Sequence, residues 1–196
     1  STWNVSQVQD MSLIFAGAAA FNQPLNNWNT ASAKEVPGMF YDATAFNQPL
    51  NNWNMSAVSQ MDAMFYGASA FNQKEGSWNI STLQSAPSMF ANSGLSCVNY
   101  DSTLIGWANT VSTPRNIDFS GEDGMVYSSA AGVAARNTLI NTKTWTINGD
   151  TYDATCDPTS SLPVQLESFQ ATRQGNTTLL TWSTATEINN KGFEVQ

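Results

Sequence analysis

The side chains of this chain that could carry out chemistry are carboxylates, hydroxyls and two cysteines, because the sequence contains no histidine. The absence of histidine removes the most common general base, the usual zinc ligand, and the Ser-His and Cys-His nucleophile pairs. The chain is acidic, with 15 acidic against 7 basic residues. No basic cluster is present to neutralise phosphates, so nucleic acid is a poor partner.

Carboxylates could serve a glycosidase, which needs two of them facing each other across a cleft. In the first half of the chain they are few and dispersed: Asp10, Glu35, Asp42, Asp62 and Glu75. The sequence also contains no glycine-rich phosphate loop, nucleophile elbow or metal-ligand constellation. We therefore expect a protein that is not an enzyme, with no catalytic residue, no cofactor and no metal ligand.

Acidic residues are denser in the second half, at Asp118, Glu122, Asp123, Asp150, Asp153 and Asp157. A calcium ion needs roughly six to eight oxygen ligands that converge on one point. Neither acidic stretch matches an EF-hand loop. We therefore favour solvated turns over a structural calcium site.

Cys97 and Cys156 are too few for a thiolate metal cage. Only 11% of the residues are charged, and the polarity comes from Asn, Ser, Thr and Gln, as is common outside the cell. In an extracellular protein two cysteines pair, and the alternative is two buried free thiols. A Cys97–Cys156 bond would close a loop of about 60 residues and stabilise the fold by about 4 kcal/mol.

The element that must position these residues is a repeat. Four Trp-Asn pairs lie 25 residues apart in the first half of the chain, and four phenylalanines recur at the same interval. A period of this length indicates a stacked array in which no single unit can bury its own apolar face. We expect the repeated aromatic residues to form a core spine: Trp3, Trp28, Trp53, Trp78, Phe15, Phe40, Phe65 and Phe90.

Local signals predict two elements in each unit. Residues 10–18 are predicted as a short helix, because Met11, Ile14, Phe15 and Ala18 have helical spacing. Residues 21–28 cannot continue a helix through Pro24, and are predicted as a strand and turn that stacks on its neighbour. Recurring asparagines are expected to satisfy turn backbone groups rather than recognise a ligand: Asn22, Asn47 and Asn72, and Asn4, Asn29, Asn54 and Asn79.

A longer pattern adds a family resemblance. The string Trp-Asn-x-Ser-x-Val-x-x-Met-x-x-Met-Phe-x-x-Ala-x-x-Phe-Asn-Gln, complete in residues 53–73, resembles the BspA-like leucine-rich-repeat surface proteins of bacteria. The resemblance covers residues 1 to about 100. It implies an α/β repeat solenoid of leucine-rich-repeat type, with short parallel strands and short helices, which is extracellular and tied to adhesion or host contact. It implies no catalytic residues.

The pattern ends near residue 94. We expect a solenoid of about four units at 1–94, an α/β C-terminal cap at 95–156 and a linker at 157–163. Within the cap, helices are predicted near 101–108 and 128–141, and a closing strand at 145–147.

Residues 164–196 predict the start of a second module. The strings Leu-Pro-Val-x-Leu-x-Ser-Phe-x-Ala and Leu-x-Trp-Ser-Thr-Ala-x-Glu-Ile-Asn-Asn-x-Gly-Phe-Glu-Val resemble a fibronectin type III-like module of Bacteroidetes-type secreted proteins. The resemblance implies type IX secretion cargo. Strands predicted at 164–171, 177–183 and 192–195 make an incomplete β-sandwich, because three strands cannot close a two-sheet core. The remaining strands lie outside this chain, or a partner adds them.

These features favour a secreted or cell-surface binding or adhesion protein that uses one solenoid face to contact a protein or a glycan. Tyr41 and Tyr66, which share one repeat position, are the candidate contact residues, and the alternative is that both pack against neighbouring turns. A structural alternative is a subunit of an extracellular filament, assembled head to tail with copies of itself. No transmembrane run is present, so we expect a chain that does not span the membrane.

Overall fold

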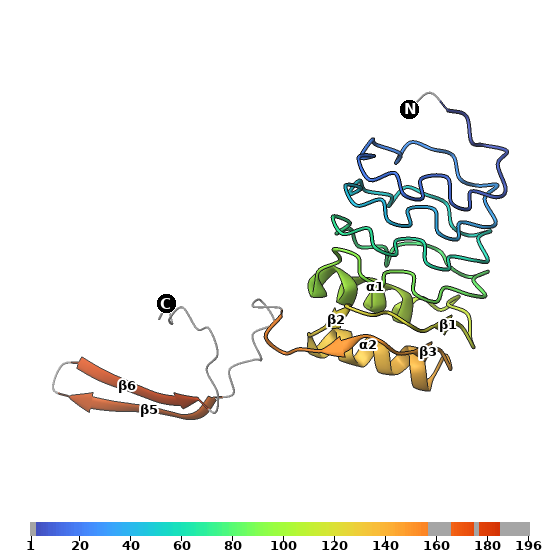
Figure 1. Ribbon diagram of the computed structural model, residues 1–196. Helices are drawn as coiled ribbons and strands as arrows, with labels where there is room; N and C mark the ends of the chain where they lie inside the picture. Colours follow the sequence, from blue (N-terminus) through green and yellow to red (C-terminus); the bar gives the residue numbers. More distant parts are fainter. Residues whose placement is uncertain (1–2, 157–165, 175–176, 185–196) are drawn as a thin grey trace. The chain divides into compact units, whose positions relative to one another are not determined.

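The computed structural model describes residues 3–156, 166–174 and 177–184, with side chains described for residues 3–156. The chain divides into two compact units, Ser1–Asp157 and Pro158–Gln196. The first unit begins with irregular coils that lie above one another and continues into two helices (Figure 1).

Each coil is joined to the next by backbone hydrogen bonds. The N–H groups of Met11 and Phe15 donate to the carbonyl oxygens of Glu35 and Met39, both at 2.9 Å. Isolated parallel bridges connect one position through the stack: Asp10, Glu35, Gln60, Ser85 and Asp118. Neighbouring coils are therefore paired in parallel, but through single bridges rather than continuous strands.

Residues 10–18 form turns, so the predicted short helix is wrong. Leu13 and Gly17 have φ values of 59° and 69°, which a right-handed helix excludes. The left-handed conformation recurs in phase at Gly38, Ala63 and Ser88, and at Asp42, Gly67 and Asn92. The N–H groups of this segment bond either to the next coil or three residues back, as Ala18 N does to Phe15 O at 3.1 Å.

Residues 21–28 form no strand either, which corrects the second local prediction. Here the coils are joined by asparagine side chains: Asn22 Oδ1 accepts from Asn47 N at 3.0 Å, and Asn47 Oδ1 accepts from Asn72 N at 2.9 Å. This ladder satisfies backbone groups. The second set of asparagines closes turns within its own coil, each accepting from the N–H two residues on: Asn4, Asn29, Asn54 and Asn79.

Aromatic rings fill the interior of the stack. Phe40, Phe65 and Phe90 are fully buried, and the Phe40 and Phe65 rings stack with centroids 5.5 Å apart. Trp28, Trp53 and Trp78 are also buried, along with Phe15. Trp3 departs from the expected spine, because it is 63% exposed. It lies in the first coil, at one end of the described stack, and its ring stacks on Phe15 of the same coil and on Trp28 of the next.

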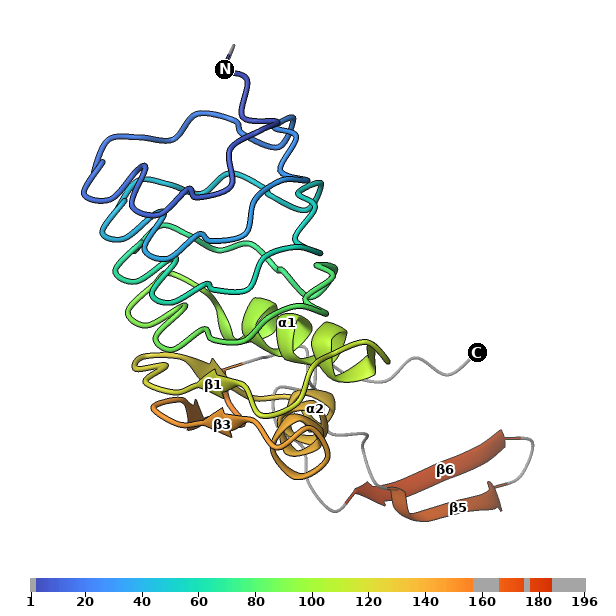
Figure 2. The same ribbon diagram turned by 90° about the vertical axis from the view of Figure 1, so that its right-hand side faces the viewer.

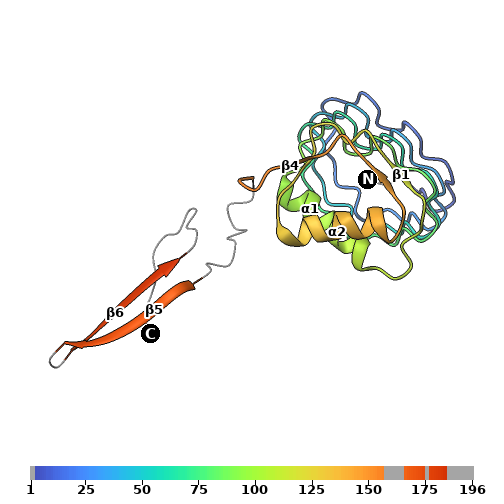
Figure 3. The ribbon, with the colours of Figure 1, turned by 90° about the horizontal axis from the view of Figure 1, so that it is seen from below.

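The coils are followed by a cap of helices and short strands. Helix α1, Cys97–Asn109, is N-capped by Ser96, and helix α2, Ala130–Asn141, is N-capped by Ser129. These helices correspond to those predicted near 101–108 and 128–141. They pack against each other on one side of the unit, and strands β1 and β3, described next, lie on another side (Figures 2 and 3).

Four two-residue strands complete the cap. Strand β1, Asp118–Phe119, pairs in parallel with β3, Thr146–Ile147, which is the predicted closing strand. Strand β2, Val126–Tyr127, pairs in parallel with β4, Thr151–Tyr152. Because Asp118 also ends the series of bridges between coils, the parallel pairing passes from the repeats into the cap.

The second unit contains an antiparallel pair of strands, β5, Leu166–Gln174, and β6, Thr177–Thr184, with Phe169 opposite Trp182. They correspond to the first two strands predicted for the second module. The third predicted strand, at 192–195, and the predicted linker at 157–163 lie outside the described residues.

Candidate functional site

Tyr41 and Tyr66 stack on each other in successive coils, with ring centroids 4.9 Å apart and planes 5° apart. Tyr41 is 37% exposed, and Leu13 of the preceding coil is 61% exposed. The Leu13 side chain lies over Gly38, where an added Cβ would come within 2.6 Å of it. We call Leu13, Tyr41 and Tyr66 the tyrosine surface. The two tyrosine rings pack on each other, Leu13 lies over Gly38 of the coil that carries Tyr41, and all three residues meet solvent.

One carboxylate adjoins the tyrosine surface. Asp42 follows Tyr41 with a φ of 52°, and its Oδ1 occupies the space that a side chain at Gly67 would need. A carboxylate acceptor therefore lies at the positions that directly follow Tyr41 and Tyr66 in their coils. This combination suits a ligand that has both apolar faces and hydrogen-bond donors, such as a sugar ring or a peptide.

The cysteines form the expected disulfide. Cys97 at the start of α1 is bonded to Cys156, with the two Cα atoms 6.3 Å apart and a sequence separation of 59. Cys97 is buried, whereas Cys156 lies just after β4 and is exposed. The bond therefore fastens the last described residue of the first unit to the point where the coils meet the cap.

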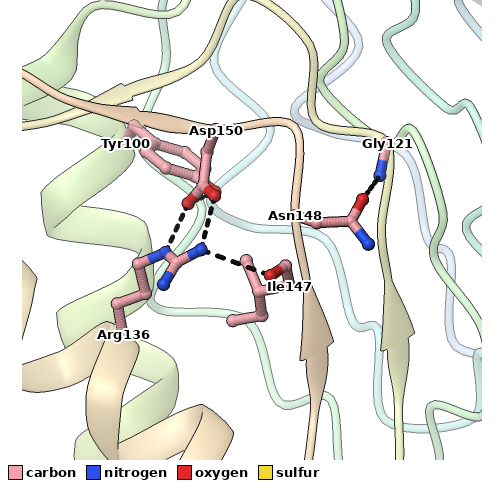
Figure 4. Close-up of polar contacts among 6 residues, drawn as sticks. All are labelled: Tyr100, Gly121, Arg136, Ile147, Asn148 and Asp150. Atoms are coloured by element: carbon pink, nitrogen blue, oxygen red, sulfur yellow. Dashed lines mark hydrogen bonds and ion pairs between the residues drawn. The ribbon is translucent and has the colours of Figure 1, made fainter.

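The acidic residues of the cap have separate partners instead of converging on one point. Asp150 forms a two-pronged ion pair with Arg136, at 2.7 Å to both Nε and Nη2, and accepts from the hydroxyl of Tyr100 at 3.1 Å (Figure 4). The hydrogen bond that Arg136 donates to Asp150 raises the pKa of Arg136. Arg136 also lies over the ring of Tyr127, 4.8 Å from its centroid. This cluster joins α1, α2 and the loop between β3 and β4.

Glu122 is fully buried and completes the hydrogen bonding of the last coil. Its two carboxylate oxygens accept from Met89 N and Phe90 N, at 2.8 and 2.9 Å. In the preceding coil the equivalent N–H, that of Phe65, donates to a carbonyl of the next coil. Burial raises the pKa of Glu122 to about 8, and the two N–H groups oppose this shift.

Glu75 was not among the functional residues expected from the sequence. It is fully buried, like Leu25 and Leu50 at the same position of the two preceding repeats. Neither of its carboxylate oxygens has a hydrogen-bond partner, and burial raises its pKa to about 8. Glu75 lines a cleft of about 550 Å³, which we call the Glu75 cleft: Pro49, Leu50, Asn51, Gln73, Lys74, Glu75, Gly76, Ser77 and Ser102. The sequence feature that could have identified this residue is a glutamate at the repeat position where the two preceding repeats have leucine.

Within the part of the chain that the structure describes, no three His, Cys, Asp or Glu side chains gather in an arrangement that could hold a metal ion. None of the described helices is long and apolar enough to cross a membrane.

The first unit thus consists of irregular coils joined in parallel by single bridges, followed by two helices and short parallel strand pairs. A family model described as "Mycoplasma protein of unknown function, DUF285" matches residues 1–103. Since this match spans more than half of the chain, the chain belongs to that family. The match is loosely consistent with the BspA-like resemblance of the repeats, and it does not extend to residues 104–196. No curated protein and no solved structure matches the chain.

Proposed function

We propose that the chain is a secreted or cell-surface protein that binds other molecules and catalyses no reaction. In this proposal the coils are a solenoid of leucine-rich-repeat type, and the tyrosine surface contacts an extracellular protein or glycan. The observation that carries the proposal is the apolar surface formed by Leu13, Tyr41 and Tyr66 across three successive coils. Exposed aromatic and aliphatic side chains placed side by side are typical of recognition surfaces.

Two other observations support the extracellular setting. The Cys97–Cys156 disulfide is a bond that persists in oxidising compartments and is rare in the cytosol. The low charge content, 11%, leaves a surface solvated through amide and hydroxyl groups. The resemblance of the repeats to BspA-like surface proteins points the same way. We extend the proposal to residues 164–196 as the start of a fibronectin type III-like module of type IX secretion cargo, with the antiparallel β5–β6 pair in support.

The test compares the unmodified chain with a double variant, Tyr41→Ala and Tyr66→Ala, on an array of immobilised glycans and a panel of purified extracellular matrix proteins. The double variant is expected to lose at least tenfold in affinity for whichever probe the unmodified chain binds. Tyr152→Ala is the matched control, because Tyr152 is 56% exposed but lies in the cap. Unchanged binding by a folded double variant would contradict the assignment of the tyrosine surface.

A second candidate function, a subunit of an extracellular filament, is favoured by the backbone edges of β5 and β6. Among the described residues these two strands pair only with each other, so each has an outer edge that could accept a further strand. Light scattering and electron microscopy of the purified chain at increasing concentration test this candidate. Growing linear particles would support it, and a constant monomer mass would contradict it.

A further inference from the structure

The Glu75 cleft is where the repeat departs from its own pattern. Residues 24–27 and 49–52 both have the sequence Pro-Leu-Asn-Asn, whereas residues 74–77 have Lys-Glu-Gly-Ser. The change places a carboxylate at a position that is fully buried in all three coils. Burying a carboxylate without a partner costs several kcal/mol in typical cases, so leucine would be the more stable choice here.

Two other buried carboxylates of the described residues have donors, whereas the half-buried Asp62 also has one buried oxygen, Oδ1, without a hydrogen-bond partner. Glu122 receives two backbone N–H groups, and Asp101 receives the N–H groups of Ser128 and Ser129, at 3.2 and 2.7 Å. Glu75 receives none. Lys74 immediately precedes it, also lines the cleft and is exposed, and among the described residues no ion pair joins the two. The partner that Glu75 lacks is therefore a hydrogen-bond donor from outside the chain.

The backbone around Glu75 is held in place by helix α1. Glu75 N donates to Thr103 Oγ1 at 3.0 Å, and Glu75 O accepts from Trp107 Nε1 at 3.2 Å. Gly76 lies against Gly106 so closely that a Cβ on Gly106 would overlap the Gly76 carbonyl oxygen. Both carboxylate oxygens of Glu75 are buried and its backbone is fixed on both sides, so contact with a molecule in the cleft requires the side chain to turn.

The remaining lining groups indicate what kind of molecule fits. The cleft is of ordinary size for a small ligand. Its polar groups, besides Glu75, are the amides of Asn51 and Gln73, the hydroxyls of Ser77 and Ser102, and the ammonium of Lys74. Amides and hydroxyls donate and accept hydrogen bonds, which matches a ligand rich in hydroxyl groups. A protonated amine adds three donors and a positive charge, which is the chemistry that an unpartnered carboxylate requires.

We propose that the Glu75 cleft binds a protonated primary amine carried on a small hydroxyl-rich body, such as an amino sugar, with Glu75 as the partner of the amine. The cleft shares no residue with the tyrosine surface, so this proposal goes beyond the function proposed above, and either can fail alone. Binding converts the Glu75 carboxylic acid to a carboxylate beside the ammonium, and the proton goes to the solvent. Binding at pH 7 therefore releases up to one proton per site.

The test is calorimetry and amide chemical-shift mapping with three probes: glucosamine, glucose and N-acetylglucosamine. Glucosamine carries the free amine, and the other two are matched controls without it. We expect glucosamine to bind at least tenfold more tightly than either control, to shift the amide resonances of Gln73, Ser77 and Ser102, and to release a proton in buffers of different ionisation enthalpy. Equal binding of the three sugars, or shifts only elsewhere, would overturn the proposal.

Two variants assign the effect to the carboxylate. Glu75→Leu restores the residue of the two preceding repeats, so it should fold at least as well as the unmodified chain and lose glucosamine binding and proton release. Glu75→Gln keeps the shape and should weaken binding at least tenfold. Glu35→Gln is the control with the same substitution at a position outside the cleft, and its binding should be unchanged. Retained binding by Glu75→Leu would refute the role of Glu75.

Discussion

At the scale of single residues, the two buried glutamates differ in their hydrogen bonding. Glu122 has two N–H partners, and Glu75 has none, although both are fully buried. Glu122 is therefore a structural acceptor that replaces the carbonyl of a further coil. The carboxylate of Glu75 has no hydrogen-bond partner within the described residues. We therefore propose a ligand site beside it.

The raised pKa of Glu75 predicts a pH dependence of stability. Its pKa is about 8 in the folded chain against an ordinary value of 4.5, so the folded state binds more protons than the unfolded state between these values. The stabilisation is complete below pH 4.5 and is lost as pH rises toward 8, by up to about 1.4 kcal/mol per pH unit.

Urea unfolding of the unmodified chain and of Glu75→Leu between pH 5 and pH 8 isolates this effect, since Glu122 contributes equally to both. The stability advantage of the leucine variant should grow with pH. A difference that stays constant across this range would show that Glu75 does not titrate as described.

Removing the Glu122 side chain should destabilise the cap end of the stack. Glu122→Ala leaves the N–H groups of Met89 and Phe90 buried and without acceptors, which costs about 1–3 kcal/mol for each. Chemical denaturation measures the loss. Asp123→Ala, at the exposed neighbouring position, is the control, and it should change the free energy of unfolding by less than about 0.5 kcal/mol.

At the scale of elements, the contact between α1 and the third coil depends on two glycines. Alanine is normally favoured over glycine in a helix by about 1 kcal/mol. At Gly106 the added methyl would overlap the Gly76 backbone, so we expect Gly106→Ala to lower the melting temperature rather than raise it. Val98→Ala, at a 43% exposed position of the same helix, should have little effect. A stabilised Gly106→Ala would show that this helix can move away from the coil.

The sequence predicts the elements of this protein unevenly, and the reasons are physical. The 25-residue interval identifies inward positions such as Phe65, because stacking repeats the burial of each position. Helices α1 and α2 were also predicted, although α1 begins at Cys97 after the cap Ser96, ahead of the predicted start near 101. The turns of the coils were not, because Leu13 and Ala63 adopt a left-handed conformation that their residue types do not indicate. Their hydrogen bonds lie between coils, where local periodicity carries no information.

The candidate sites were likewise predictable only in part. Tyr41 and Tyr66 could be singled out because they share one repeat position, and their stacking follows from it. The Glu75 cleft could not be derived, because a cleft depends on which segments a helix approaches. Only the placement of Ser102 on α1 near residues 73–77 brings its lining together.

At the scale of the whole molecule, the disulfide makes stability depend on redox conditions. Reduction of Cys97–Cys156 should lower the free energy of unfolding by about 4 kcal/mol for a loop of this length. Denaturation with and without a reductant measures the change. The variant with both Cys97→Ser and Cys156→Ser should match the reduced chain and be insensitive to the reductant. If the oxidised and reduced chains unfolded at the same denaturant concentration, the predicted contribution would be wrong.

The same bond also sets the route of mechanical tension. The hydrogen bonds between coils run along the stack. A pulling force applied to residues beyond Cys156 would therefore act on one coil after another and separate the coils one at a time. The disulfide passes that load from Cys156 directly to Cys97, and the loop between them carries none of it. Helix α2 and strands β1–β4 are thereby shielded. Reduction would add about 200 Å of extensible length, at roughly 3.3–3.6 Å per residue. The cap can therefore extend under tension only in a reducing environment.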